Sequence, residues 1–401
     1  MADLVPSPPA AAHRAWLTLL LAGGPAAPRR ALLDAHGDAR AALAAGAVAW
    51  RAAGCTPAQL EALTVPAQAN IEHALRWLDR AGHHLIGYTD ARYPLLLRET
   101  DSAPLALFVD GEPALLQHPG VAIVGSRRPS ASGTDHTTEF AHALAAAGLV
   151  VVSGLAAGID AAAHRAALTL PQGLTVAVLG TGADVPYPSR HAGLRDLVAA
   201  RGAVVSEYLP GTRPLAGHFP ARNRIVAGLT LGTLVIEAAQ RSGALITARL
   251  AAEAGREVFA VPGSIRNPLA RGCHRLIRDG ALLVESPQEV LAVLGPLALR
   301  QGRNLQPVPA SALHGDRPAP IEQAGAGFGP GCGFPSGPGQ PPSPASADYQ
   351  RLWRALGHDP IPMDSLVQRT GLTAATLSSM LLAMELEGRV VAEHGRYTRN
   401  P

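Results

Sequence analysis

The sequence predicts an α/β fold with a mostly parallel sheet, preceded by a small helical domain and followed by a winged-helix domain. Seven apolar runs without polar alternation predict strands that are buried on both faces, which is typical of a parallel sheet. Helical periodicity fills residues 12–82, and a pattern of three helices and a hairpin fills the tail from residue 348. The 401 residues suffice for these domains and a large core.

The seven runs supply the central sheet of the domain that we predict over residues 83–296. In chain order they are VAIVGSR, LVVVSG, TVAVLG, AVVSEY, LTLGTLVIE, REVFAVPGS and ALLVES. A lead-in segment that carries Pro94 and Pro104 is expected to add edge structure before the first of them. Ligands of parallel sheets lie outside the carboxyl ends of the strands, where small residues let backbone N–H groups come close. The recurring Gly and Ser residues therefore predict one continuous anion-binding rim.

The N-terminal domain, predicted over residues 1–82, reads as several short helices. Thr56 before Pro57 has the features of an N-cap with proline at the first helical position. Ile71, Leu75 and Leu78 mark one apolar face. Such a module can dock the DNA backbone or serve packing and partner contacts only, and the sequence leaves both open.

The C-terminal third divides into a linker and a winged-helix domain. Residues 297–347 are rich in Pro, Gly and Ser, which predicts a disordered linker. In the winged-helix domain, predicted over residues 348–401, the recognition helix carries Glu385 and Glu387 and no arginine before Arg389. A reader of base edges needs Arg, Lys, Asn or Gln, so we favour a protein-contact or regulatory role over sequence-specific DNA reading.

Composition excludes several classes of protein. The chain contains no lysine, so a phosphate loop of the GxxxxGK[ST] type cannot exist. Ten Arg against three Glu between Leu209 and Arg278 give a local charge of +7, which indicates a polyanionic partner.

The three cysteines are isolated and lack metal-ligand spacing, so we expect a reduced, cytoplasmic setting and no metal. No segment is apolar enough for a membrane span, and we interpret the apolar N-terminal stretch as a folded helix rather than a signal peptide.

The rim supplies the candidate binding residues. Ser126 and Arg127 after the first run suit a phosphate oxygen, together with the N–H groups at the start of the following helix. In the segment HFPARNRIVAGL, Phe219 offers a stacking face for an unpaired base, while Arg222 and Arg224 can meet phosphates. The complete predicted set is Gly125, Ser126, Arg127, Ser153, Gly154, Gly180, Thr181, Gly182, Phe219, Arg222, Asn223, Arg224, Ser242 and Gly243. Asp160 and His164 are spaced to form a polar pair without a nucleophile, and Tyr187 is expected to brace a turn.

The ordered motifs GSR, SGLAxGIDxxAH, GTGxDVPYP, SEYxPG, FPxRNRIxAGL, VIEAxxxSGxLITA, AVPGS and GCxxLIxDGA resemble the DNA-processing protein A (DprA/Smf) family over residues 121–286. The resemblance implies a Rossmann-like, doubly wound fold and a homodimer. It also implies a protein that binds single-stranded DNA, protects incoming DNA and loads the RecA recombinase during natural transformation, without a cofactor or hydrolytic activity. By the same resemblance, residues 272–284 are the expected dimer interface.

This sequence departs from the family pattern at three positions. Relatives often carry Lys near Ala216, Arg at Ala157 and Asn at His274, so phosphate contacts are expected to be weaker unless Arg213 or another arginine substitutes. The alternative function is a nucleotide-binding enzyme of the phosphoribohydrolase type on a related fold. Its PGGxGTxxE signature is absent, and GxGxxG does not follow the first strand either, so we expect a binding protein and not an enzyme.

Overall fold

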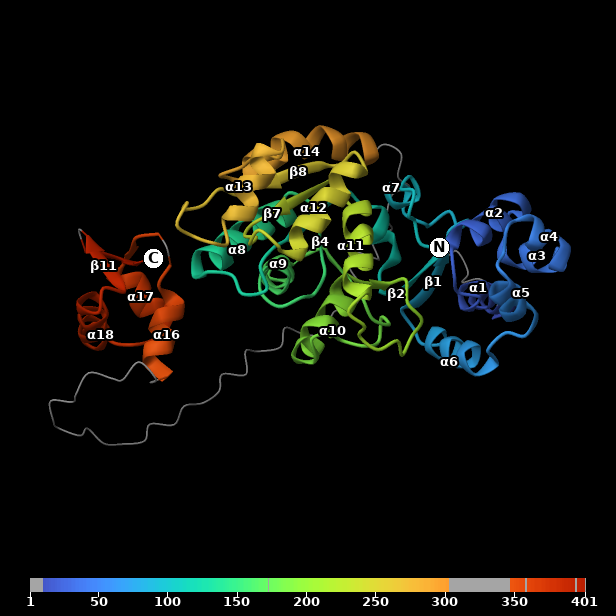
Figure 1. Ribbon diagram of the computed structural model, residues 1–401, viewed down its shortest axis with the longest axis horizontal. Coiled ribbons are helices and arrows are strands. Elements are labelled where there is room, and N and C mark those ends of the chain that lie inside the picture. Colours follow the sequence, from blue (N-terminus) through green and yellow to red (C-terminus); the bar gives the residue numbers. More distant parts are fainter. Residues whose placement is uncertain (1–9, 172, 303–346, 358, 394, 401) are drawn as a thin grey trace. The chain divides into compact units, whose positions relative to one another are not determined.

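The computed structural model describes residues 10–171, 173–302, 347–357, 359–393 and 395–400. The described residues form two compact units. One holds the N-terminal helices and the large sheet, and the other holds the C-terminal helices and a small sheet (Figure 1). Most of the predicted linker, including Cys332, lies outside the described residues. Helix α14 (Pro287–Gly302) continues past the predicted boundary at residue 296, and its Leu297 and Ala298 pack against the core.

The large sheet has nine strands in the order β1-β2-β6-β5-β4-β3-β7-β8-β9, and from β6 to β9 all pairings are parallel. Its strands are β1 (His83–Gly87), β2 (Ala106–Gly111), β3 (Gly120–Val124), β4 (Val150–Ser153), β5 (Thr175–Val178), β6 (Ala203–Ser206), β7 (Gly232–Val235), β8 (Glu257–Ala260) and β9 (Leu282–Leu283). Each of the seven apolar runs therefore contains one strand. The lead-in segment adds β1 and β2, which extend the sheet by antiparallel pairing.

Strand β3 is the point where the winding of the sheet reverses. Strands β4, β5 and β6 follow on one side of it, whereas β7, β8 and β9 follow on the other. Successive residues of β3 serve the two faces, because Val121 and Ile123 belong to one core cluster and Ala122 and Val124 to the other. This double burial explains why the run lacks polar alternation. The sheet is doubly wound and mostly parallel, as the sequence predicted.

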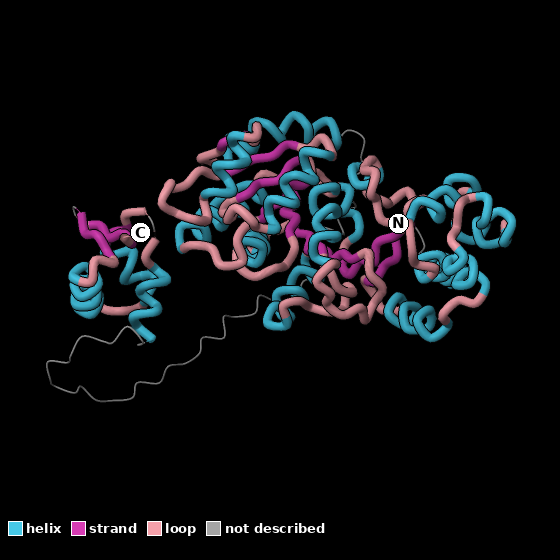
Figure 2. Tube along the Cα trace, viewed as in Figure 1, coloured by secondary structure: helices cyan, strands magenta, loops and turns pink. Residues whose placement is uncertain are grey.

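Helices cover both faces of this sheet (Figure 2). Helices α8 (Ala131–Ala146), α9 (Ile159–Leu168) and α14 pack on the face of Val121 and Ile123. Helices α11 (His218–Gly228), α12 (Gly243–Glu253) and α13 (Arg271–Arg278) pack on the face of Ala122 and Val124. Helix α10 (Ala192–Arg201) contacts β5, β6 and β2, and α7 (Leu95–Arg98) is a single turn between β1 and β2.

The N-terminal helices form a small bundle around Trp16, Leu17 and Ile71. They are α1 (Ala10–Leu21), α2 (Ala26–His36), α3 (Ala39–Ala44), α4 (Gly46–Ala52), α5 (Pro57–Thr64) and α6 (Gln68–Leu78). Thr56 caps α5 through a capping box with Gln59, and proline occupies the first helical position, as predicted. None of the helices in the described part of the chain is long and apolar enough to cross a membrane.

The C-terminal unit has the winged-helix fold. Helices α16 (Ala347–Ala355), α17 (Met363–Thr370) and α18 (Ala374–Leu386) are joined by a small sheet in the order β10-β12-β11. Its strands are β10 (Ile361–Pro362), β11 (Val390–Glu393) and β12 (Arg396–Arg399). The unit has its own core, which contains Leu352, Leu366, Leu377, Met380 and Met384. The predicted fold class is therefore confirmed for the sheet, the helical front and the tail.

Candidate nucleic-acid interface

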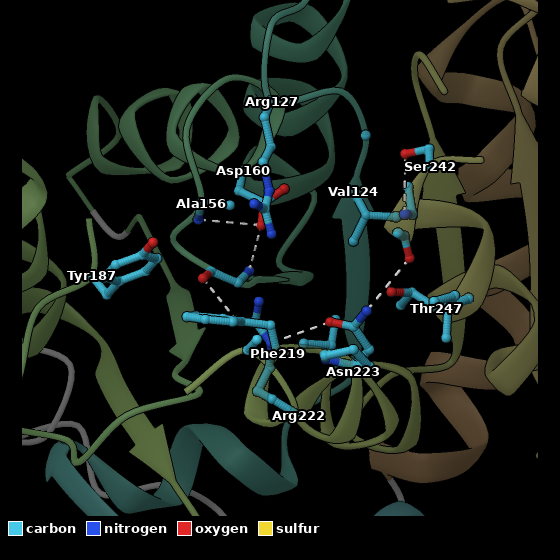
Figure 3. A pocket seen from close by; sticks show the side chains of 18 of the residues that line it. Val124, Arg127, Ala156, Asp160, Tyr187, Phe219, Arg222, Asn223, Ser242 and Thr247 are labelled. Carbon is cyan, nitrogen blue, oxygen red and sulfur yellow. Dashed lines mark hydrogen bonds between the residues drawn. The ribbon is translucent and has the colours of Figure 1, made fainter. Parts of the chain in front are cut away.

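A cleft of about 660 Å³ lies at the carboxyl ends of the central strands (Figure 3). The loops after β3, β4 and β5 contribute to it, together with the first turns of α11 and α12. This is the switch point of the doubly wound sheet, where ligands of such folds bind. Eight of the predicted residues line it: Gly125, Arg127, Gly154, Phe219, Arg222, Asn223, Ser242 and Gly243.

Arg127 presents an exposed cation to the cleft. Its guanidinium forms no ion pair with any other residue that the structure describes. The neighbouring Ser126 is buried, and its Oγ accepts the N–H of Arg128 at 3.1 Å. The carbonyl of Ser126 accepts the N–H of Ile159 at 3.1 Å. Ser126 therefore shapes the turn that presents Arg127. It was predicted to contact a phosphate, but it does not line the cleft.

The start of α8, which was expected to hold a phosphate, faces a carboxylate of the protein itself. A Cβ at Gly133 in the first turn would lie 2.5 Å from Glu237 Oε2. An acidic group at this position disfavours a second anion. The start of α12 is open instead, because Gly243 is exposed and lines the cleft. Ser242 caps this helix, with its Oγ accepting the Ala244 N–H at 3.3 Å.

Arg222 is an internal clamp. Its side chain is buried, and Nη1 donates to the carbonyl of Gly154 at 2.7 Å and to that of Val178. It thereby joins the ends of β4 and β5, and burial lowers the pKa of its guanidinium. A Cβ at Gly154 would lie 2.3 Å from guanidinium nitrogens, so only glycine fits beside the clamp. Ser153 is likewise internal, because its Oγ donates to the Ile123 carbonyl at 2.7 Å.

Among the described residues that line the cleft, Asp160 is the single acidic one. Its Oδ2 accepts the N–H groups of Gly154 at 3.1 Å and Ala156 at 3.4 Å. Burial raises the pKa of this carboxyl, and the nearby Arg222 opposes the shift. The carboxylate thus closes the turn after β4. Gly154 belongs to the predicted site, whereas Asp160 and Ala156 line the cleft without having been predicted as binding residues.

His164 bonds within the core and has no hydrogen bond to Asp160. Its Nδ1 lies 2.7 Å from Thr175 Oγ1, and this hydroxyl already donates to the Val151 carbonyl. Nδ1 is therefore the donor. Nε2 is buried without a hydrogen-bond partner, and burial disfavours the charged ring. Burial lowers the pKa of His164 to about 3. The polar pair anticipated from the helical spacing does not form.

The loop after β5, which contains Gly180, Thr181 and Gly182, supports residues of the cleft. Thr181 Oγ1 donates to the Val185 carbonyl at 2.6 Å, and the Gly182 N–H donates to the Thr212 carbonyl at 2.9 Å. Gly180 packs against Phe219, where a Cβ would lie 3.1 Å from Cδ1. None of these three residues lines the cleft, so they position other residues instead.

The α11 segment divides its side chains between the cleft and the opposite side. The ring centroids of Phe219 and Tyr187 lie 4.9 Å apart, and both residues line the cleft. Asn223 also lines it, and its Nδ2 reaches the Gly243 carbonyl at 3.4 Å. Arg224 instead pairs with Glu207 and borders a different hollow, so the expectation that it lines the groove is not met.

The segment from Leu209 to Arg278 has a lower net charge in its folded surroundings than its sequence suggests, because acidic residues from elsewhere pair with its arginines. Several of its ten arginines have acidic partners from outside the counted segment, including Glu99 for Arg256, Glu207 for Arg224 and Asp279 for Arg275. Among the described contacts, ion pairs are absent for Arg213, Arg241, Arg266, Arg271 and Arg278, which are exposed.

The three departures from the family pattern occupy different environments. Ala216 lines the cleft, so a basic side chain there would face the ligand. Ala157 is not among the lining residues. His274 Nε2 lies 3.0 Å from the Gly263 carbonyl and therefore belongs to the α13 region. Only the change at Ala216 bears directly on the cleft.

The doubly wound sheet and the cleft at its switch point define a Rossmann-like protein, and the arginine and the helix start in this cleft are groups suited to an anion. The family model described as DNA recombination-mediator protein A matches residues 84–295, and a DprA winged-helix domain model matches residues 336–396. Protein Smf of Escherichia coli K12 is 40% identical over 354 residues, which cover 88% of this chain and 87% of that protein.

Two further comparisons agree. DNA processing protein DprA of Streptococcus pneumoniae is 52% identical over 203 residues, covering 51% of this chain and 71% of that protein. The X-ray structure of DNA processing protein A from Streptococcus pneumoniae superposes with a TM-score of 0.63 at 40% identity, covering 70% of this chain and 97% of that one. The chain belongs to the DNA recombination-mediator protein A family.

Proposed function

We propose that this protein is a recombination mediator that binds single-stranded DNA in the switch-point cleft. The observation that carries the proposal is the combination, in one cleft, of the exposed Arg127, the open start of α12 and the aromatic pair of Tyr187 and Phe219. Cations and helix N-termini suit phosphates, whereas aromatic rings suit unpaired bases. A duplex hides its base faces, so this combination favours a single strand.

In this proposal the loop after β3 and the start of α12 bind the phosphate. Arg127 with Ser242 and Gly243 takes the phosphate, and Gly125 allows the turn that carries Arg127 to pack closely on the protein. A Cβ at Gly125 would lie 2.7 Å from the Ile159 side chain, so glycine is required there. Asn223 stands near the α12 end and offers an amide to sugar or base.

A titration of fluorescent oligo-dT against a blunt duplex of equal length tests the binding function. We expect far tighter binding of the single strand, with an affinity that falls as salt is added, because phosphate contacts release counterions. Equal binding of both DNAs, with no change on replacing Arg127 by alanine, would reject the cleft as the binding site.

The recombination steps that we propose are protection of incoming DNA and loading of the RecA recombinase during natural transformation. Membership of the recombination-mediator family supports them. The test is RecA filament formation on oligonucleotide already coated with a single-strand-binding protein. Addition of this protein should shorten the lag, and a lag that stays unchanged would contradict RecA loading without touching DNA binding.

We further propose that the protein forms a homodimer whose interface contains residues 272–284. Strand β9 is the edge of the large sheet, and its Leu282 and Leu283 are 41% and 47% exposed. An edge strand with exposed leucines favours pairing with another chain. Light scattering should give twice the chain mass for the native protein, and Leu283→Arg should give the single-chain mass.

The enzyme alternative is tested by its product. A phosphoribohydrolase would release free base from a nucleoside monophosphate. Asp160 is the carboxylate in the described cleft, and one of its oxygens already accepts two backbone N–H groups. We therefore propose binding without hydrolysis, and release of base that is lost on Asp160→Asn would favour the enzyme instead.

For the winged-helix unit we propose a protein-contact role. Helix α18 contains no arginine, and its Leu382 and Leu386 are 58% and 82% exposed. An apolar exposed face is suited to a protein partner rather than to base edges. Replacing both leucines by serine should leave affinity for duplex DNA unchanged, and a clear loss would favour a DNA-reading role.

A further inference from the structure

Tyr187 and Phe219 form one aromatic unit at the cleft. Their centroids are 4.9 Å apart and their planes are inclined by 35°. A base inserted between two rings needs about 7 Å, which is two van der Waals separations of about 3.5 Å. The pair cannot accept a base between its members, so a base must stack on an outer face.

The two rings differ in how much surface they leave to a ligand. Phe219 is only partly exposed and packs against Gly180, where an added Cβ would come within 3.1 Å of its ring. The ring of Tyr187 covers a further part of Phe219. Tyr187 is 42% exposed and is the outer member of the pair. The larger free aromatic surface therefore belongs to the tyrosine.

The loop that carries Tyr187 is held in place. Asp184 Oδ1 accepts the Gly211 N–H at 2.8 Å, and the Gly182 N–H donates to the Thr212 carbonyl at 2.9 Å. Within the loop, Thr181 Oγ1 donates to the Val185 carbonyl. These bonds tie the loop to the segment before α11, which bears Phe219. A ring that is already ordered loses little conformational freedom when a base stacks on it.

We propose that Tyr187 is the base-stacking residue of the cleft and that Phe219 is the positioning ring behind it. This inference rests on the proposed binding of single-stranded DNA. It assigns a binding task to a residue that the sequence predicted as a turn brace, and it moves the stacked base one ring outward from Phe219.

The experiment compares oligo-dT with an abasic oligonucleotide of the same length, using the full chain and fluorescence anisotropy. Tyr187→Ala should weaken oligo-dT binding about 5- to 150-fold, which corresponds to about 1–3 kcal/mol for one stacked base. Tyr187→Phe should stay within about twofold of the native protein, because it keeps the ring. On the abasic strand Tyr187→Ala should change nothing, since there is no base to stack.

A second arm separates the two rings. If Phe219 acts through Tyr187, the double alanine variant binds oligo-dT about as weakly as Tyr187→Ala alone. Leu197→Ala, which removes another exposed apolar side chain (45% exposed), is the control and should change nothing. Equal losses on oligo-dT and abasic DNA, no loss at all, or additive losses for the two rings would overturn the assignment. Failure of the native protein to bind any single strand would instead reject the proposed function.

Discussion

In the cleft of the large sheet, Arg127 is exposed and forms no ion pair with a described residue, whereas in the winged-helix unit Arg389 and Arg399 each lie 4.6 Å from the ring of Trp353. Arg389 also donates to the Tyr349 hydroxyl at 2.6 Å. Arg127 remains available to a ligand, whereas Arg389 and Arg399 pack against aromatic rings of their own unit. Counting arginines therefore says little about basic surface until their partners are known.

The cleft itself contains both uses of arginine. Arg127 is available to a ligand, whereas Arg222 bonds to the carbonyls that end β4 and β5. The two residues have the same charge and line the same cleft. Substitution should therefore affect stability at Arg222 and DNA binding at Arg127.

The largest effect is expected for Arg222→Met. The variant leaves the Gly154 and Val178 carbonyls without their donor and Asp160 without its nearby cation. We expect the free energy of unfolding to fall by about 2–4 kcal/mol, and urea denaturation measures it. Arg213→Met, at an exposed arginine, is the control and should cost less than about 0.5 kcal/mol. Equal stability of the two variants would show that Arg222 is not a clamp.

Acid should destabilise the sheet unit through His164. Its pKa is lowered to about 3 in the folded protein from 6.5 when unfolded, so the unfolded chain takes up a proton first as the pH falls. Stability is thus full above pH 6.5 and declines toward pH 3. From this group alone we expect a loss of about 2–3 kcal/mol between pH 6.5 and 4.5.

Urea titrations at several pH values measure this dependence. His164→Gln should flatten it, even though the variant costs stability at pH 7 by losing a buried hydrogen bond. His36→Gln, at an exposed position, should leave the dependence unchanged. The assignment to His164 fails if both variants retain the slope of the native protein.

Arg127→Ala should affect binding and spare stability. We expect oligo-dT affinity to fall by about tenfold and the salt slope to shrink by about 0.7, the value for one phosphate contact on a single strand. The neighbouring Arg128→Ala is a matched control, because Arg128 is exposed but does not line the cleft. If both alanine variants bind alike, general charge rather than the cleft explains the affinity.

The smallest effect is expected in the winged-helix unit. Arg389→Ala removes a cation that lies over Trp353 and Tyr349, and it should lower the stability of that unit by about 1 kcal/mol. Tryptophan fluorescence during thermal melting follows it. Arg396→Ala, in the exposed wing, should change neither the melting nor oligo-dT binding by more than about twofold. A larger loss of DNA affinity for either variant would place the wing in the binding surface.

Much of the fold was predictable from local sequence. The apolar runs located all seven parallel strands, and the repeated Gly and Ser residues located the rim at their carboxyl ends. The site was predicted only in part. Eight of the fourteen predicted residues line the cleft, whereas Gly180, Thr181 and Gly182 support it, and Ser126, Ser153 and Arg224 have side chains that do not reach it. For these three, residue type and position in a motif were informative, but the direction of the side chain was not.

The missed features depend on partners that are remote in the chain. Glu237 lies against Gly133 at the start of α8, and this contact spans more than a hundred residues of sequence. Glu207 takes Arg224 away from the cleft, and Tyr187 meets Phe219 from another loop. No periodicity or spacing encodes such meetings. An aromatic residue in each of two rim loops was the available signal for the ring pair.

The sequence by itself determined where the parallel strands lie along the chain, the edge of the sheet where ligands are expected and the family of the protein. Strands buried on both faces give continuous apolar runs, and tight turns require glycine, so both features can be predicted from local sequence. The tertiary structure alone decided which arginine is free, which helix start is open and which ring is outermost. These properties depend on what each group contacts in the folded chain, because a charge or a ring is available to a ligand only where no other part of the protein has taken it.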